Sequence, residues 1–334
     1  MKKTSIKDIA RLSGVSVATV SRVINNNGRF SEETRRKVER VIHDTNYEMN
    51  YSAKNLRMHR SDTIGILIPD ISNFFFAELT KLLEEELFSS GYSVIICNTA
   101  HDDVREKAYL KVLASKGIDG LIVISGSTKF ELDQTDSTNQ IPYVCVDRQP
   151  QDQSQTIFIS SDHYQGAYLA TKTLLQAKSY HPVIAIGTFD TPPMRDRLQG
   201  FNQALEEHNV DQTNWGHVFK LSTLEKAESD TKAYLERHPQ TDSFFAVNDM
   251  VALKLEQVLH RLGKKIPLDI KLIGVDNAPT DEYVTPTLSS VAQDNAALAH
   301  QAVKYLLGLV NGTEQPGQEI ILPTSLKLRG TTGH

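Results

Sequence analysis

The chain has 334 residues, of which 40% are hydrophobic and 23% are charged, and its formal net charge is −5. This length is sufficient for a small module and two lobes with cores of their own. The sequence has no run of about eighteen apolar residues, so it predicts neither a membrane-spanning helix nor a membrane partner.

The charge is distributed unevenly along the chain. Residues 1–60 hold 13 Lys and Arg against 6 Asp and Glu, a net charge of +7, and the rest of the chain has a net charge of −12. A basic head on an acidic body predicts a phosphate-binding module attached to a second module. The N-terminus lacks the apolar region of a secretory signal, and both cysteines, Cys97 and Cys145, lie in apolar runs. We therefore expect a cytoplasmic protein with reduced thiols and no metal or other cofactor.

The segment from Thr4 to Asn25 predicts two short helices joined by a tight turn. The first helix begins near Lys7, and Gly14 supplies the permissive backbone of the turn. One face of this helix is apolar and consists of Ile6, Ile9, Ala10 and Leu12. Ser16 is a good N-cap for the second helix. The inward face of the second helix consists of Val20, Val23 and Ile24, and its outward face shows Val17, Ala18, Ser21 and Arg22.

A third helix closes this head. Residues 25–28 (Asn-Asn-Asn-Gly) form a loop by their turn chemistry, and Ser31 starts the helix. Its apolar stripe is Val38, Val41 and Ile42. A short helix with a small polar face fits the major groove of DNA. The same three helices could also form a small domain with no ligand, because this motif recurs in proteins that do not bind DNA.

The sequence of the head decides between these interpretations. The stretch IKDIARLSGVSVATVSRVIN strongly resembles the DNA-binding head of the lactose/galactose repressor (LacI/GalR) family. The resemblance continues through GRFSEETRRKVERVIHDTNYEMN, SAKNLR and IGILIPDISNFFF, and then over nearly the whole chain. It implies a sequence-specific DNA-binding transcriptional repressor and not an enzyme. The residues expected to contact DNA from the head are Thr4, Lys7, Ser16, Val17, Ala18, Thr19, Ser21, Arg22 and Asn25.

Residues 50–61 follow as a linker that is too short for a stable free helix. The resemblance implies that residues 50–57 become a hinge helix on operator DNA, where two copies enter the minor groove and a leucine wedges a base step. Leu56 matches that leucine, and Ala53 matches a flanking position. The family usually has Ala-Arg-Ser-Leu, whereas this chain has Ala-Lys-Asn-Leu. Lysine lacks the guanidinium fork of arginine, so weaker hinge contacts are expected.

Strands and helices alternate from residue 62 onward. Strands are predicted at Thr63–Ile68, Ser93–Cys97, Leu121–Ile124, Tyr143–Val146, Ile157–Ile159, Val183–Ile186, His217–Phe219, Ser243–Val247, Lys271–Gly274, Leu288–Val291, Glu319–Leu322 and Ser325–Leu328. Helices are predicted at Phe76–Ser90, Val104–Ser115, His163–Gln176, Met194–His208, Lys226–Arg237, Val251–Leu262 and Ala296–Val310, with a short helix before residue 143. Apolar strands that alternate with helices predict an α/β fold with two parallel sheets, each covered on both faces. The chain has no Gly-x-Gly-x-x-Gly, Walker or Gly-x-Ser-x-Gly motif, so a dinucleotide enzyme or hydrolase is unsupported.

The resemblance implies that this body is a two-lobed core like a periplasmic sugar-binding protein. Three crossings between the lobes are expected, near residues 160–162, 291–293 and 322–324. The expected domains are a helix-turn-helix head (1–49), a hinge and linker (50–61) and an effector-binding and dimerisation core (62–334). The N-lobe would comprise about 62–161 and 293–322, and the C-lobe about 162–292 and 323–330. Ligands in such folds bind at the carboxyl ends of strands, between the lobes.

Polar and aromatic residues lie just after several strands, where that cleft is expected. The predicted ligand-binding residues are Asn73, Phe75, Phe76, Asp147, Arg148, Arg197, Asn248, Asp276 and Gln293. Each could instead be a helix cap or a core residue. As a set they have the aromatic faces, amides and charges that a sugar site requires.

The set resembles the ribose-type branch of the binding-protein superfamily, which has an Asn-x-Phe-Phe element and an Asp-Arg pair. Phe74 occupies a position where that branch usually has proline. The resemblance therefore favours D-ribose as the effector, with fructose or another hexose as the alternative. The motif IPDISN and the long helix of the N-lobe also resemble catabolite-control regulators that bind a phosphocarrier protein, which is a second alternative.

The resemblance also implies how such a repressor acts. A ligand that prefers one lobe arrangement shifts an equilibrium and changes the spacing of the two hinges. The family's tetramers carry a C-terminal heptad tail, which is absent here, so a homodimer that reads a pseudo-palindromic operator is expected. A solute-binding protein for transport is the rival class, and the basic head disfavours it.

Overall fold

The computed structural model describes residues 4–24, 26–45, 47, 60–126, 129–132, 141–187, 190–210 and 217–333. The chain divides into two compact units, Met1–Ser61 and Asp62–His334. The predicted DNA contacts of Asn25, Ala53 and Leu56, and the expected hinge helix, lie outside the described residues.

The head contains the three predicted helices, α1 (Ile6–Ser13), α2 (Val17–Ile24) and α3 (Glu32–Asp44). Their core is the apolar cluster of Ile9, Ala10, Val20, Val23 and Val38. A capping box between Ser5 and Asp8 begins α1, and Gly14 ends it in the left-handed conformation at φ 68°. The turn and the three helices therefore follow from the local sequence.

One residue of the predicted apolar face of α1 does not face the core of the head. Leu12 is 54% exposed, whereas Ile9 is fully buried. Successive residues rotate by about 100° around a helix, which places Leu12 about 110° from the midpoint between Ile9 and Ala10. The assignment of Leu12 to the core face was therefore wrong.

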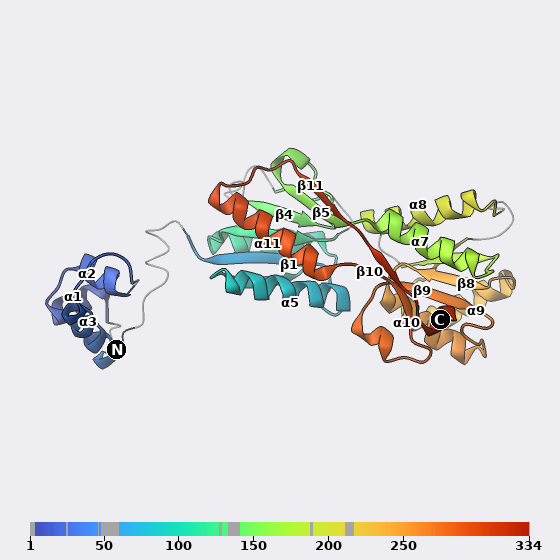
Figure 1. The fold of residues 1–334 in the computed structure, drawn as a ribbon, viewed down its shortest axis with the longest axis horizontal. Helices are drawn as coiled ribbons and strands as arrows, with labels where there is room; N and C mark the ends of the chain where they lie inside the picture. The colour runs from blue at the N-terminus through green and yellow to red at the C-terminus, as the bar shows by residue number, and fades with distance from the viewer. Residues whose placement is uncertain are drawn as a thin grey trace. The chain divides into compact units, whose positions relative to one another are not determined.

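The second unit is built on two six-stranded sheets (Figure 1). The first sheet, which defines the N-lobe, has the order β11-β5-β4-β3-β1-β2, and all its neighbouring strands are parallel. Its strands are β1 (Thr63–Ile68), β2 (Ser93–Asn98), β3 (Gly120–Ile124), β4 (Tyr143–Val146), β5 (Ile157–Ser161) and β11 (Glu319–Leu322). Helices α5 (Phe74–Ser89) and α11 (Asn295–Asn311) share one apolar cluster with the sheet, and α6 (Asp103–Ser115) belongs to a second. The helices therefore cover both faces, as parallel sheets require.

The second sheet defines the C-lobe and has the order β12-β10-β9-β8-β6-β7. Its strands are β6 (Pro182–Ile186), β7 (Val218–Lys220), β8 (Ser243–Ala246), β9 (Lys271–Asp276), β10 (Ser289–Ala292) and β12 (Ser325–Lys327). Its helices are α7 (His163–Gln176), α8 (Pro192–Glu207), α9 (Ala227–Arg237) and α10 (Asp249–Arg261). Figure 1 shows α7 and α8 on one side of this sheet and α9 and α10 on the other. A Cβ on Gly200 would lie 2.1 Å from the carbonyl oxygen of Tyr164, so α8 can approach α7 this closely only with glycine there.

The chain crosses between the two sheets three times, from β5 to α7, from β10 to α11 and from β11 to β12. The last crossing has no helix, and among the described strands β12 is the one that pairs antiparallel, with β10. The described part of this unit also contains the short 3-10 helices η2 (Gln153–Gln155), η3 (Pro279–Glu282) and η4 (Gly330–Thr332). The predicted fold class, a helix-turn-helix head with a two-lobed α/β core, is confirmed. Within the described residues, no helix is long and apolar enough to span a membrane.

Candidate functional site

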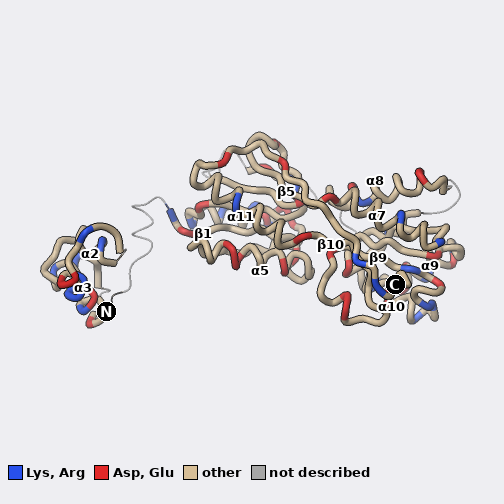
Figure 2. The backbone as a smooth tube through the Cα atoms, viewed as in Figure 1, with Lys and Arg blue, Asp and Glu red and all other residues tan. Residues whose placement is uncertain are grey.

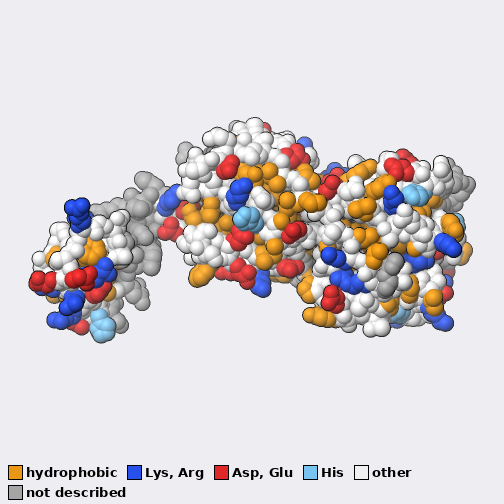
Figure 3. Space-filling view, viewed as in Figure 1, with side chains coloured by type: hydrophobic (Ala, Val, Ile, Leu, Met, Phe, Trp, Pro, Cys, Tyr) orange, Lys and Arg blue, Asp and Glu red, His pale blue; other side chains and the backbone are white. Residues whose placement is uncertain are grey.

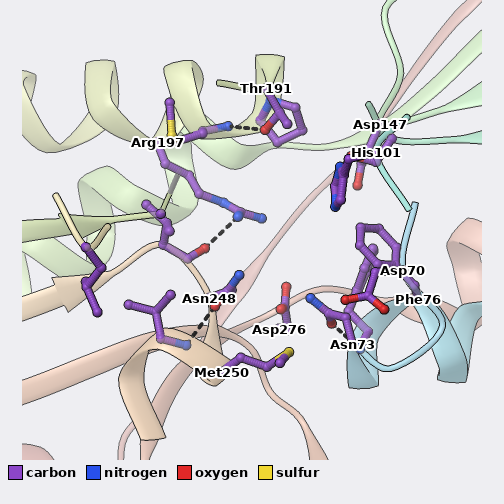
Figure 4. Close-up of a pocket in the computed structure, with 18 of the residues that line it drawn as sticks. Asp70, Asn73, Phe76, His101, Asp147, Thr191, Arg197, Asn248, Met250 and Asp276 are labelled. Atoms are coloured by element: carbon purple, nitrogen blue, oxygen red, sulfur yellow. Dashed lines mark hydrogen bonds between the residues drawn. The ribbon is translucent and has the colours of Figure 1, made fainter. Parts of the chain in front are cut away.

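A cavity of about 240 Å³ lies between the carboxyl ends of the two sheets. Asp70, His101, Ser125 and Asp147 line it just after N-lobe strands, and Asn248 and Asp276 line it from the C-lobe. Figure 4 shows Asp70, Asn73, Phe76, His101 and Asp147 on one side, facing Thr191, Arg197, Asn248 and Met250 on the other. Both lobes therefore contribute to one site, as the parallel winding of each sheet requires.

The structure brings together eight of the nine predicted ligand-binding residues. The lining includes Asn73, Phe75, Phe76, Asp147, Arg197, Asn248, Asp276 and Gln293. Arg148 is the exception and does not line the cavity. Its guanidinium donates to the carbonyl oxygen of Ser125 at 3.0 Å and to Glu106 Oε2 at 3.1 Å. Arg148 is only 3% exposed, so it supports the wall of the cavity from behind.

Two asparagines act both as helix caps and as lining residues. Asn73 Oδ1 accepts from the backbone N–H of Phe75 at 2.9 Å, and Asn248 Oδ1 accepts from that of Val251 at 2.8 Å. The caps explain why α5 and α10 each begin two residues before the predicted start. Because each oxygen is used by the backbone, the Nδ2 donors are left for a ligand. A bound molecule therefore meets two oriented amide donors, one from each lobe.

The two lining phenylalanines stand in the first turn of α5. Phe75 and Phe76 pack edge to face, with ring centroids 5.3 Å apart and an interplanar angle of 67°. Phe75 is buried in the N-lobe core and Phe76 is half-buried. Phe75 thus holds Phe76 in place, and the wall beside Asn73 is aromatic.

Asp147 and Arg197 are held by hydrogen bonds to other groups of the protein. Asp147 Oδ1 accepts from Ser160 Oγ at 2.6 Å and contacts His163 Nε2 at 3.0 Å. Burial raises the pKa of Asp147, but the interactions with His163, Ser160 and Arg197 outweigh burial and hold it below its ordinary value. Arg197 Nη1 donates to the carbonyl oxygen of Val247 at 2.6 Å. The cavity therefore contains a fixed carboxylate and a fixed guanidinium.

Asp276 is the second carboxyl group predicted for the site. Gln293 Nε2 donates to Asp276 Oδ1 at 2.8 Å, and Gln293 Oε1 is buried with no hydrogen-bond partner among the described residues. Burial raises the pKa of Asp276 to about 8. At neutral pH Asp276 is therefore a neutral acid whose O–H can donate a hydrogen bond to a ligand oxygen, and Gln293 Oε1 lacks a donor that a ligand hydroxyl could supply.

Several lining residues were not predicted from the sequence. Asp70, His101 and Ser125 follow β1, β2 and β3, and Thr191 is the N-cap of α8. Asp70, His101 and Ser125 follow strands, which is the criterion that selected Asn73. It would not have separated them from ordinary loop residues, since nearly every strand is followed by polar positions.

The predicted DNA-contacting residues of the head lie on α1, on α2 and at their N-termini. Lys7, Ser16, Ala18 and Arg22 are exposed, and Thr4, Val17, Thr19 and Ser21 are half-buried. Ser16 Oγ accepts from the backbone N–H of Thr19 at 3.1 Å, so Ser16 caps α2 as predicted. Arg22 projects from the last turn of α2, beside the backbone of Gly28.

The third helix carries further basic residues (Figure 2). Arg35 and Lys37 already have acidic partners on α3, with the Lys37 Nζ to Glu33 Oε1 distance at 2.8 Å. Arg36 and Arg40 are exposed. Within the described part of the chain, no group of three or more His, Cys, Asp or Glu side chains could hold a metal ion.

A basic three-helix head with a two-lobed ligand-binding core defines a ligand-controlled DNA-binding regulator. Residues 5–50 match the model of bacterial regulatory proteins of the lacI family, and residues 173–332 match that of a periplasmic binding protein-like domain. A ribose operon repressor from Halalkalibacterium halodurans is 34% identical over 98% of this chain and 97% of that protein. A transcriptional repressor PurR from Vibrio vulnificus is 32% identical over 98% of each chain. The chain therefore belongs to the lacI family.

Solved structures agree with this assignment. A lac repressor dimer bound to operator and the anti-inducer ONPF has a TM-score of 0.85 over 99% of each chain, at 23% identity, and so shows the shared fold. A LacI family regulator from Enterococcus faecium with bound ribose has a TM-score of 0.70 at 27% identity, over 80% of this chain and 98% of that chain. The chain is a DNA-binding transcriptional repressor, and the prediction that it is not an enzyme is confirmed.

The raised pKa of Asp276 predicts a pH dependence of stability. The unfolded chain loses this proton near pH 4, whereas the folded protein keeps it up to about pH 8. The stabilising contribution of the group is therefore fully present below about pH 4 and is lost as the pH rises to about 8. The variant Asp276→Asn has no such proton, so its free energy of unfolding should rise relative to wild type between about pH 5 and about pH 8.

Urea unfolding of both proteins across this range measures the difference. Asp103→Asn, at an exposed aspartate of α6, is the control for the loss of a surface carboxylate. A difference between Asp276→Asn and wild type that does not change with pH would contradict the raised pKa.

Proposed function

We propose that the chain represses a sugar-utilisation operon and that an unphosphorylated monosaccharide, D-ribose first, binds in the cavity and weakens operator binding. The single observation that carries the proposal is the composition of the cavity. It combines an aromatic wall with amide donors, carboxyl groups and a guanidinium that approach from both lobes. A polyol presents alternating hydroxyl groups and apolar ring faces, and these are the groups that such a lining binds.

The charge of the cavity favours a neutral sugar over a sugar phosphate. Among the described lining residues, Arg197 is the one Lys or Arg, and it stands with Asp70 and Asp147. Burial lowers the pKa of His101, which disfavours a positive charge there. Arg148 is paired with Glu106. A phosphate needs a surplus of positive charge, and the lining has none.

The size of the cavity favours a single sugar ring. Its volume of about 240 Å³ is below the roughly 300–1,000 Å³ of sites that take drug-sized ligands. The ribose-bound family member and the relative named as a ribose operon repressor support a pentose. Fructose or another hexose is the alternative, and it differs by one carbon unit that residues at the cavity mouth would have to accommodate.

Arg148 enters the proposal as a support of the site. Direct contact with a sugar would require its guanidinium to leave both Glu106 and the Ser125 carbonyl. A Cβ on Gly126 would lie 1.8 Å from Arg148 Nη1, so the guanidinium packs directly against the backbone that follows β3. In this arrangement Arg148 fixes the position of Ser125, which lines the cavity. A phosphocarrier partner, as in catabolite-control regulators, remains the second alternative, and the cavity does not require one.

The head is proposed to read bases with α2 and the hinge to bend DNA through Leu56. The exposed positions Ala18 and Arg22 are one helical turn apart, so they project from the same face. Arginine pairs with guanine in the major groove through two hydrogen bonds. Thr4, Lys7, Ser16, Val17, Thr19, Ser21 and Asn25 are proposed to contact the phosphates and bases around this pair, and Ala53 to flank the wedge.

A homodimer is proposed to read the two halves of a pseudo-palindrome. The observation that supports it is the apolar surface around β2, the last strand of the N-lobe sheet. Ile96 of β2, Phe88 of α5 and Val112 of α6 are 41%, 73% and 46% exposed. Figure 3 shows hydrophobic side chains on the visible surface of both lobes. An open sheet edge flanked by apolar side chains is typical of a surface that another chain covers.

Base reading by Arg22 predicts a sequence-dependent loss. Arg22→Ala should cost roughly 1–3 kcal/mol on the cognate operator and little on random DNA, because the bidentate contact with guanine is lost. Arg11→Ala, at an exposed arginine of α1, removes the same charge and is the control. Fluorescence anisotropy with both DNAs measures the difference, and equal losses on the two DNAs would show that Arg22 only holds phosphate.

The cavity predicts selectivity for the unphosphorylated sugar. Calorimetric titration of the full chain should show ribose binding at least about tenfold more tightly than ribose 5-phosphate, because the carboxylates repel the phosphate. Gln293→Leu should weaken ribose binding, because an apolar side chain leaves the Asp276 carboxyl and a sugar hydroxyl without their partner. Leu268→Ala, at an exposed residue outside the lining, is the control. Binding of phosphorylated sugars alone would overturn the proposal.

A further inference from the structure

One buried side chain joins Asp147 and Arg197, two charged residues of the cavity, without lining the cavity itself. His163 Nε2 lies 3.0 Å from Asp147 Oδ1, and His163 Nδ1 lies 3.2 Å from Arg197 Nη2. The side chain of His163 is 1% exposed. Asp147 follows β4 of the N-lobe, and Arg197 belongs to α8 of the C-lobe. His163 therefore connects one ligand-facing residue of each lobe.

The chemistry of arginine fixes the direction of both hydrogen bonds. A guanidinium can only donate, so His163 Nδ1 must accept from Arg197 Nη2. A neutral imidazole carries one N–H, which is then on Nε2 and donates to Asp147 Oδ1. The three residues thus form one directional chain of hydrogen bonds from Arg197 through His163 to Asp147, which we call the relay. A protonated ring, or a ring with its hydrogen on Nδ1, would place an N–H against the arginine.

The bonds to Asp147 leave one of its oxygens for a ligand. Oδ1 accepts from Ser160 Oγ, from His163 and, at 3.4 Å, from the backbone N–H of Ser161. No hydrogen bond to Oδ2 is present among the described residues, and Asp147 lines the cavity. Arg197 likewise uses two of its five N–H groups for Val247 and His163. A ligand therefore meets an acceptor and a set of donors whose separation His163 determines.

The position of His163 in the fold links this separation to the arrangement of the lobes. It is the first residue of α7, directly after β5 carries the chain out of the N-lobe sheet. Ser160, which bonds the same carboxylate oxygen, still belongs to β5. Movement of α7 relative to β5 would therefore change the distance between Asp147 and Arg197.

We propose that His163 is a positioning residue that holds Asp147 and Arg197 at the spacing of two neighbouring hydroxyl groups of a sugar and couples their contact with ligand to the lobe crossing. The proposal rests on the proposed function for the identity of the ligand. Two hydroxyls on adjacent carbons can bind both residues at once, one by donating to Asp147 Oδ2 and the other by accepting from Arg197.

Two variants of His163 and one of Ser160 test this role. His163→Leu removes both hydrogen bonds and should weaken ribose binding roughly tenfold to a hundredfold, because two charged groups lose a partner. His163→Gln has a donor and an acceptor on one terminal group and should bind ribose within about threefold of wild type. Ser160→Ala removes a donor to the same oxygen of Asp147 from within the N-lobe, so it should cost less than His163→Leu. Calorimetry on the full chain compares them.

Equal losses in Ser160→Ala and His163→Leu would show that His163 serves Asp147 alone and would overturn the bridging role. Unchanged affinity in His163→Leu would overturn the positioning role altogether. If the Leu variant does not fold, the comparison of His163→Gln with wild type still decides, because a loss of more than about tenfold in the Gln variant contradicts the relay.

A measurement without sugar separates this inference from the proposed function. Nitrogen NMR shifts of the His163 ring in the ligand-free full chain should show a hydrogen on Nε2 and none on Nδ1. A hydrogen on Nδ1 would overturn the relay. If wild type binds none of the sugars while the ring has the expected tautomer, the proposed ligand is wrong and the connection between the lobes stands.

Discussion

The site depends on the parallel winding of both sheets. In a parallel sheet covered by helices, all the carboxyl ends lie at one edge, and the loops after the strands meet there. Two such sheets with three chain crossings between them place described residues from the ends of nine strands around one cavity. Each lobe contributes groups that are rigid because they stand at a strand end or in the first turn of a helix. The antiparallel strand β12 follows the crossing from β11, and none of its residues belongs to the described lining of the cavity.

Many lining groups use part of their hydrogen-bonding capacity for the fold and leave the rest for a ligand. Asn73 and Asn248 cap helices with their oxygens and present their amide hydrogens. Asp147 has one oxygen saturated by the protein, and Arg197 is anchored to a backbone carbonyl. A polyhydroxy ligand would satisfy the remaining donors and acceptors, and an unfilled site leaves buried polar groups short of partners. The same lining groups would therefore determine both the affinity for the ligand and its orientation in the cavity.

The sequence predicted the fold through local signals. Alternating apolar strands and amphipathic helices specify parallel sheets, and α7 and β11 have the predicted bounds. The largest differences in helix start, at α5, α8 and α10, arise because a capping side chain extends the helix toward the strand. Most of the predicted lining residues could be found because they follow strands, whereas Arg197 lies inside α8 and was predicted from the family resemblance. The position of Arg148 could not, since its partner Glu106 lies 42 residues away on α6. The relay through His163 could not be predicted from the sequence either, because the two partners of His163 lie on different lobes, 16 and 34 residues away.

Thermodynamic linkage between the two sites tests the account most directly. If ribose in the cavity weakens operator binding, operator must weaken ribose binding by the same factor. The measurement is the ribose affinity of the full chain, free and saturated with operator DNA, beside the operator affinity with and without saturating ribose. The account predicts equal factors of roughly tenfold or more in both directions. The same ribose affinity for the free and the operator-bound protein would contradict it.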